Sequence, residues 1–187
     1  LRGHVAEALA HIERAVGKAF RDAADPLLVS VRSGARVSMP GMMDTVLNLG
    51  LNDATVEGLA ARSQSPRFAW DSYRRFVAMF GDVVLGMKPA SKEDRDPFDE
   101  LLERKKEARG VKFDSELPED ALRELVLESK AEIRARTGQG FPDDPYAQLV
   151  EAILAVFRSW DNDRAIAYRK LYRYPSDWGT AVSVQSM

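Results

Sequence analysis

The chain contains no cysteine and only two histidines among its 187 residues. The absence of cysteine excludes disulfide bonds, thiolate metal sites and a cysteine nucleophile. The histidines, His4 and His11, lie seven residues apart on a segment with helical periodicity, so they share one helix face. We expect that face to be solvated, because a histidine pair alone is a weak indication of a metal site. The sequence therefore predicts no metal ligands in this chain.

Long hydrophobic runs and a strong excess of charge are also missing. No apolar stretch approaches the roughly 18 residues of a membrane span, and the first residues carry no signal-peptide pattern. With a formal net charge of −2, nothing favours non-specific binding to nucleic acid or to a membrane surface. We expect a cytoplasmic globular protein with neither of these partners.

Two common enzyme signatures are absent as well. No Gly-x-x-x-x-Gly-Lys-Ser/Thr motif occurs, which argues against a P-loop enzyme. Ser33 and Ser38 have no histidine in a plausible pairing, which argues against serine nucleophile catalysis.

Periodicity in the first 64 residues predicts helices around one short strand. Residues 1–20 have helical spacing of apolar residues, and "DPLLVSVRSG" reads as a buried strand. For "DTVLNLG" we predict one or two helical turns, with Asp44 as the cap and Gly50 as the stop. Asp53 is expected to cap a further short helix that runs to Ala61.

Beyond residue 64, prolines at expected first-turn positions predict a series of helices. A capping residue precedes a first-turn proline at Ser65-Pro66, Asp96-Pro97 and Asp144-Pro145, and Pro118 is followed by two acidic residues. Gly138 is the expected end of one helix. A last helix is predicted over 164–172, followed by a strand in "WGTAVSVQSM".

These elements indicate an α+β fold that is predominantly helical. We expect a partial nucleotide-binding subdomain at 1–64, a helical insertion or lid at 65–143, and helices that return to a strand at 144–187. The first and last residues interrupt patterns, so the chain is expected to be an internal fragment of a longer polypeptide.

The segment "VRSGARVSMPGMMDTVLN", residues 31–48, carries the features of an anion site. Arg32 ends a strand and offers a guanidinium suited to bidentate contact with phosphate oxygens. Small residues follow it and permit close approach of backbone N–H groups, and Pro40-Gly41 predicts a turn that exposes more of them. On these residues alone, a strand, a tight turn and a hydrophobic loop with methionines as core filler is the favoured interpretation.

Several segments resemble the N-terminal nucleotide-binding domain of the pyruvate, phosphate dikinase family. They are "PLLVSVRSGARVSMPGMMDTVLNLGLND", "RFAWDSYRRFVAMFGDVVLG", "AVFRSWDNDRAIAYRKLY" and "DWGTAVSVQSM". The resemblance spans most of the chain in the same order, and only residues 88–143 are generic. It implies part of an ATP-grasp domain. The whole enzyme would convert ATP, phosphate and pyruvate into AMP, pyrophosphate and phosphoenolpyruvate, with magnesium.

The resemblance also implies roles for particular residues. Arg32 corresponds to the arginine that contacts ATP phosphates, and Gly41, Met43 and Thr45 lie in the loop over those phosphates. Arg75 resembles a second phosphate-side arginine, although helical phase does not separate it from Arg74. Gln185 and Met187 would lie near the adenine base.

Other parts of that family's machinery are missing here. Its glycine-rich segment with a phosphate-binding lysine and its acidic magnesium ligands are expected outside this chain. No "TSHA" motif occurs, so the phosphorylated histidine would belong to another domain of the same polypeptide, which is the expected partner. The parent enzyme is expected to be a homo-oligomer, and the chain alone is expected to be inactive.

Alternatives remain open at this point. The chain could derive from a phosphoenolpyruvate synthase-like dikinase, although "SMPGMMDT" favours the first family. It could instead be a non-catalytic helical interaction module. Lys105 or Lys106 could reach ATP from a lid, and Arg158 could face nucleotide or a docking domain.

Overall fold

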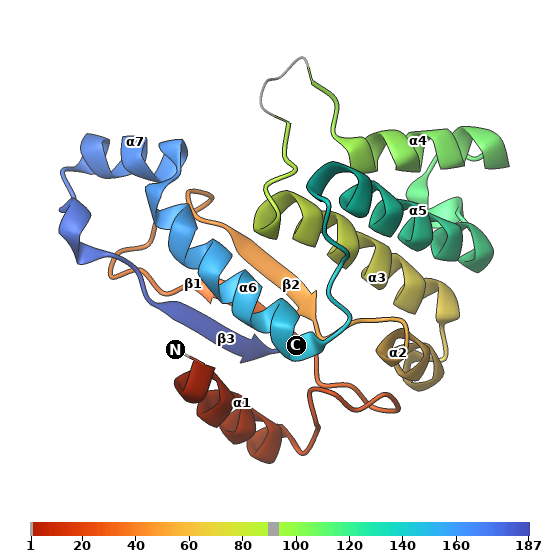
Figure 1. Ribbon diagram of the computed structural model, residues 1–187, viewed down its shortest axis with the longest axis horizontal. Coiled ribbons are helices and arrows are strands. Elements are labelled where there is room, and N and C mark those ends of the chain that lie inside the picture. Colours follow the sequence, from red (N-terminus) through yellow and green to blue (C-terminus); the bar gives the residue numbers. More distant parts are fainter. Residues whose placement is uncertain (1, 90–93) are drawn as a thin grey trace.

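The structure is a computed structural model that describes residues 2–89 and 94–187. Two strands follow the first helix, a run of helices follows them, and the third strand comes last (Figure 1). The α-helices and strands are α1 (Arg2–Val16), β1 (Val29–Ser33), β2 (Thr45–Leu49), α2 (Thr55–Ser63), α3 (Pro66–Met79), α4 (Pro97–Arg109), α5 (Glu119–Thr137), α6 (Pro145–Arg158), α7 (Asp163–Tyr172) and β3 (Val182–Ser186). Shorter turns of helix are η1 (Phe80–Val84), which is a π-helix, and the 3₁₀ turns η2 (Asp114–Glu116), η3 (Ser159–Asp161) and η4 (Ser176–Trp178).

The strands form an antiparallel sheet in the order β2-β1-β3 within the described part of the chain. Figure 1 shows α6 lying across this sheet, with α1 beside β3 and the group α3, α4 and α5 on the side of β2. The architecture is thus mostly helical with one small sheet. This agrees with the predicted α+β class.

The register of the strands divides their side chains between two faces. Residues directly opposite each other in antiparallel strands project to the same side. Val31 lies opposite Val46 and Val184 on the face that α6 covers. Arg32, opposite Thr45 and Ser183, therefore projects from the other face. We call this second side the open face of the sheet.

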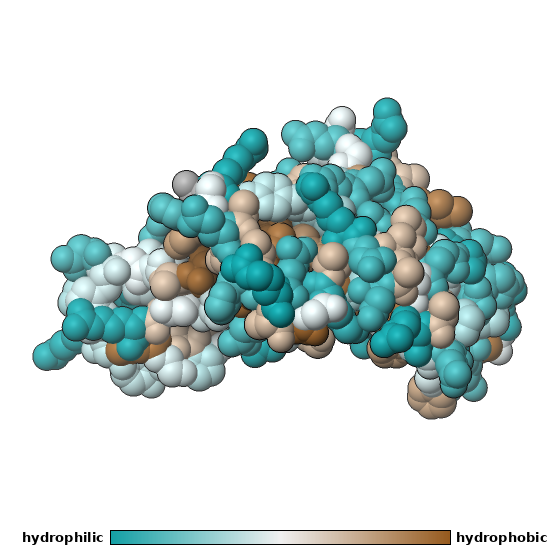
Figure 2. Space-filling view, turned by 90° about the horizontal axis from the view of Figure 1, so that it is seen from below, coloured by the Kyte–Doolittle hydropathy of each residue, from teal (hydrophilic) through white to brown (hydrophobic). Residues whose placement is uncertain are grey.

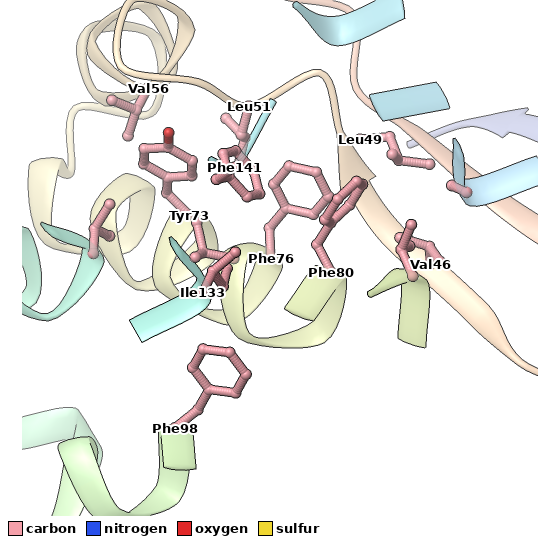
Figure 3. Packing of buried hydrophobic residues seen from close by; sticks show 14 of the residues in the cluster. Val46, Leu49, Leu51, Val56, Tyr73, Phe76, Phe80, Phe98, Ile133 and Phe141 are labelled. Carbon is pink, nitrogen blue, oxygen red and sulfur yellow. The ribbon is translucent and has the colours of Figure 1, made fainter. Parts of the chain in front are cut away.

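The main core lies where α3 packs against α2, α5 and β2. Figure 3 shows the rings of Tyr73, Phe76, Phe80 and Phe141 gathered there, with ring centroids 5.3–6.2 Å apart in edge-to-face pairs. Leu149 of α6 belongs to the same continuous cluster, so sheet and helices share one core.

The capping predictions after residue 64 are confirmed. Ser65 accepts a hydrogen bond from the Phe68 N–H at 3.4 Å, and Asp96 accepts one from the Phe98 N–H at 2.8 Å. Asp144 does the same for the first turn of α6. Gly138 ends α5 with a φ of 71°, which favours glycine. The predicted last helix and last strand are α7 and β3.

The predicted helical turns at residues 44–50 are wrong, because this segment is strand β2. Pairing with β1 supplies its backbone hydrogen bonds, and burial of Val46 and Leu49 stabilises the extended form. Asn48 takes a φ of 59° where the register shifts, so a bulge interrupts the alternation that would have indicated a strand. Asp44 is therefore not a helix cap.

Asp53 is also not the cap of α2. The Asn52 side chain accepts hydrogen bonds from the N–H groups of Ala54 and Thr55 at 3.0 and 2.8 Å. Asp53 instead pairs with Lys130 of α5 at 2.7 Å and accepts a hydrogen bond from the Tyr73 hydroxyl. It joins α5 to α3.

Candidate functional site

Arg32 lies on the open face of the sheet, near the end of β1. Its side chain is exposed and makes no ion pair with the described residues. Thr45, the first residue of β2, lies opposite it. The chain between these two positions forms a connection over residues 34–44, which we call the connecting loop. A free guanidinium therefore lies beside the ends of a loop with several unpaired backbone amides.

The connecting loop approaches β3 closely at its start. The Gly34 N–H donates to the Ala181 carbonyl at 2.7 Å, and a Cβ at position 34 would lie 3.4 Å from that of Ala181. The Ser33 hydroxyl lies 3.1 Å from the Met43 sulfur, across the base of the loop. The Ser33 contact joins the two ends of the loop, and the Gly34 contact ties its start to the residue before β3.

The tip of the loop is the predicted Pro40-Gly41 turn, and the structure confirms it. The Met42 N–H donates to the Met39 carbonyl at 3.1 Å, and Gly41 has a φ of 71°. A proline followed by a residue with positive φ is the arrangement of a type II turn. The Met39 side chain, at the first position of the turn, is buried and anchors the turn.

The far end of the loop is held by the segment that joins α6 to α7. The Asn162 side-chain amide donates to the Met42 carbonyl at 3.0 Å, and the Asp44 N–H donates to the Ser159 hydroxyl at 3.2 Å. The Asp44 carboxylate in turn pairs with Lys88 and Arg164, each at 3.3 Å. The loop is therefore tied to three other segments of the chain.

Arg74 and Arg75 occupy different environments on α3. Both pair with Asp71, through Nη2 of Arg74 at 2.7 Å and Nε of Arg75 at 3.0 Å. The Arg74 side chain is 10% exposed, whereas that of Arg75 is 59% exposed. Only Arg75 of the two is thus accessible to a ligand.

Arg75 belongs to a stripe of α3 that also contains Phe68, Ser72 and Met79, at spacings of four, three and four residues. Arg75 and Phe68 are exposed, whereas Ser72 and Met79 are half-buried. The Met79 sulfur accepts a hydrogen bond from the Leu47 N–H of β2 at 3.3 Å. Phe68 and Ser72 line a surface hollow of about 310 Å³ next to the strand ends. The stripe thus runs from β2 to this hollow.

Met187 lies at the same hollow, beside Leu28 and Asn48. Its N–H donates to the Leu28 carbonyl at 2.9 Å, and its sulfur accepts from the Asn48 N–H at 3.3 Å. Gln185 is exposed and lies opposite Ser30, so it shares the open face with Arg32. The structure thus places the predicted adenine-side residues at one end of the sheet and the predicted phosphate loop at the other.

The lysines considered as lid residues are held by neighbouring carboxylates. Lys105 pairs with Glu128 at 2.6 Å and Glu124 at 2.9 Å, and Lys106 pairs with Glu103 at 2.6 Å. The Lys105 pairs join α4 to α5, the Lys106 pair lies within α4, and both ammonium groups are occupied.

Asp82 has the most perturbed carboxyl group near this region. It lies on the π-helix, against Asp96 at the start of α4. Burial, together with the negative charge of Asp96, raises the pKa of Asp82 from 3.8 to about 7. The Asp82 carboxyl group therefore keeps its proton up to about neutral pH.

The described residues do not offer a metal site of their own. Among residues 2–89 and 94–187, no three His, Cys, Asp or Glu side chains lie together in a way that could hold an ion. His4 and His11 are both exposed on α1. In the same ranges, no helix is long and apolar enough to cross a membrane. Figure 2 shows a mostly hydrophilic surface with separate hydrophobic patches.

Sequence reasoning missed the residues that shape and hold the site. For Phe68 and Ser72 a signal was present, since they share a helix face with Arg75. The contacts of Asn162 and Ser159 with the loop join residues more than 100 positions apart, and no local pattern indicates them.

Residues 1–187 match the protein family described as "Pyruvate phosphate dikinase, AMP/ATP-binding domain". The chain is 52% identical over 188 residues to the pyruvate, phosphate dikinase of Clostridium symbiosum and covers 21% of it. It is 53% identical over 187 residues to that of Giardia intestinalis, with 20% covered. It is 53% identical over 183 residues to the chloroplastic pyruvate, phosphate dikinase 1 of Arabidopsis thaliana, with 18% covered. The chain thus spans about a fifth of the length of these curated relatives.

Proposed function

Because the chain belongs to the pyruvate phosphate dikinase AMP/ATP-binding domain family, we propose that it binds ATP within a longer enzyme. That enzyme would convert ATP, phosphate and pyruvate into AMP, pyrophosphate and phosphoenolpyruvate. The observation that carries this proposal is the family match over the whole chain. The exposed Arg32 beside the connecting loop supports it.

In this proposal, the open face of the sheet holds the nucleotide. The Arg32 guanidinium would neutralise charge on the phosphate oxygens, and amides between Gly41 and Thr45 would donate to them. Arg75 would approach from α3. Gln185 and Met187 would lie against the base, with the hollow beside Met187 as its nearest recess.

The reaction would use a histidine on another domain of the same polypeptide. The histidine nitrogen would attack the β-phosphorus of ATP and release AMP. The pyrophosphoryl group on nitrogen would then pass its outer phosphoryl to inorganic phosphate and form pyrophosphate. The remaining phosphohistidine would phosphorylate pyruvate. This chain would contribute phosphate binding and orientation to the first of these steps.

The proposal also covers the fold, the divisions of the chain, the metal, the oligomeric state and the compartment. We propose an ATP-grasp domain with the divisions 1–64, 65–143 and 144–187. Magnesium would supply further charge neutralisation of the phosphates, and its ligands would come from parts of the longer protein outside this chain. The cytoplasmic location remains a prediction, because the plant relative is named as chloroplastic. A homo-oligomeric parent enzyme is also a prediction.

Formation of phosphohistidine tests the function directly. We expect the full-length protein to acquire an acid-labile phosphoryl group on histidine when it is incubated with ATP, magnesium and phosphate. Pyruvate should then remove the group and yield phosphoenolpyruvate. A full-length protein that forms no phosphohistidine from ATP would contradict the proposal.

The isolated chain tests the claim that the site is incomplete. We expect the 187-residue chain to turn over no ATP and to bind Mg-ATP weakly or not at all. Calorimetric titration that shows micromolar binding would contradict this part of the proposal.

A further inference from the structure

The segment between α6 and α7 forms a rigid base behind the connecting loop. The Arg169 side chain is 6% exposed, donates to the Trp160 carbonyl and lies over the Trp160 ring at 4.0 Å. The Trp160 indole N–H donates to the Ser176 carbonyl at 3.2 Å. Ser159 donates to the Val156 carbonyl at 2.7 Å. Contacts with Val156, Arg169 and Ser176 thus hold residues 159–162 independently of their contacts with the loop.

Asn162 makes two hydrogen bonds that point in different directions. Its side-chain oxygen accepts from the Ala165 N–H at 2.8 Å and caps α7. Its side-chain nitrogen donates to the Met42 carbonyl at 3.0 Å, across 120 positions in the sequence. One contact serves the helix and the other serves the loop.

The contact with Met42 determines where the next amide points. In a planar trans peptide, the carbonyl and the following N–H point in opposite directions. Since Asn162 holds the Met42 carbonyl, the Met43 N–H points away from the α6–α7 segment. This N–H has no hydrogen-bond partner within the described residues. One peptide further, the Asp44 N–H is directed oppositely, to the Ser159 hydroxyl.

We propose that Asn162 and Ser159 are positioning residues for the nucleotide reaction, which present the Met43 N–H to a phosphate oxygen. This inference rests on the proposed function and extends it to residues that touch no nucleotide themselves. A preoriented amide stabilises developing charge without reorganisation during the reaction. Loss of the contact behind it lets the peptide rotate, so that the amide loses its direction.

The Asn162→Asp variant of the full-length enzyme separates the two roles of Asn162. The carboxylate keeps an acceptor for the α7 cap but cannot donate to Met42, and it repels that carbonyl. We expect the rate of phosphohistidine formation from ATP to fall by about tenfold or more, with a higher KM for ATP. Exchange of the phosphoryl group between phosphoenolpyruvate and pyruvate should remain unchanged.

Two further variants make the test specific. Ser159→Ala removes the acceptor for the Asp44 N–H, and we expect it to slow the ATP reaction while sparing the pyruvate reaction. Asp144→Asn makes the reverse carboxylate-amide exchange at the cap of α6, away from the connecting loop. This control should change neither partial reaction.

The outcomes distinguish failure of the positioning role of Asn162 and Ser159 from failure of the proposed function. If the parent forms phosphohistidine from ATP and Asn162→Asp matches it, Asn162 only caps α7 and the inference is wrong. Equal losses in both partial reactions would mean a general defect of folding and would also overturn it. If the parent itself forms no phosphohistidine, the proposed function fails, and the inference fails with it.

Discussion

Arg32 on β1 lies directly opposite Thr45 on β2, and both project from the face of the sheet that α6 leaves uncovered. The connecting loop begins and ends at this pair. A strand-end cation and the amides of a neighbouring loop are thereby brought to one place by strand pairing. This is the arrangement that the proposed phosphate site requires.

The two adjacent arginines of α3 should respond differently to truncation. Arg74→Ala leaves the Asp71 carboxylate without its buried partner, so we expect the free energy of unfolding to fall by about 2 kcal/mol or more. Arg75→Ala removes a mostly exposed ion pair and should cost at most about 0.5 kcal/mol. Urea denaturation of the 187-residue chain measures both values.

Arg75→Ala, which costs little stability, should be the variant that lowers the rate of the ATP reaction directly. In the full-length enzyme, Arg75→Ala should slow phosphohistidine formation from ATP without loss of folded protein. If Arg75→Ala leaves that rate at the parent value, Arg75 has no part in phosphate binding.

Replacement of Gly41 tests the turn at the tip of the connecting loop. A Cβ there meets no atom within 4 Å, so the only penalty of Gly41→Ala is the positive φ of 71°. We expect a loss of stability of about 1 kcal/mol and a slower ATP reaction. Gly140→Ala is the matched control, because position 140 is equally open and has no positive φ. It should change stability by less than about 0.5 kcal/mol, and equal effects of the two variants would contradict the assigned turn.

Asp82 should make stability depend on pH. Its pKa is raised to about 7 in the folded chain from 3.8, so the folded state holds a proton that the unfolded state releases. The stability from this proton is complete below the unfolded pKa and is lost as the pH rises through 7. We expect Asp82→Asn to be more stable than the parent at pH 8, because the parent then carries two adjacent negative charges.

At pH 5 the advantage of Asp82→Asn should largely disappear, because Asp82 in the parent is then protonated. Urea denaturation at the two pH values measures this difference. Asp177→Asn, at an exposed position on η4, is the control and should show no such change. An advantage of Asp82→Asn that is the same at pH 5 and pH 8 would mean that Asp82 is not perturbed as described.

The helices after residue 64 could be predicted because their signals are local. A capping side chain such as Ser65 or Asp96 bonds to an N–H only two or three residues away, so the sequence alone contains both partners. The buried faces of these helices follow from periodicity in the same way. The family resemblance and the strand-end arginine were also readable from contiguous residues.

The second strand and the support of the site could not be predicted in this way. β2 is short and bulged at Asn48, and its extended form depends on pairing with β1. The same reasoning explains Asp53, which binds Lys130 in place of capping α2. The bond of the Asn162 side chain to Met42 joins residues 120 positions apart, so no local pattern indicates it.

Substitution of Arg32 in the full-length enzyme tests the central claim most directly. Arg32 is exposed and free of ion pairs with the described residues, so Arg32→Ala should leave the fold intact. We predict that phosphohistidine formation from ATP falls by on the order of a hundredfold or more, while phosphoryl exchange between phosphoenolpyruvate and pyruvate is unchanged. Loss of both reactions would assign Arg32 a structural role, and retention of both would remove it from the nucleotide site.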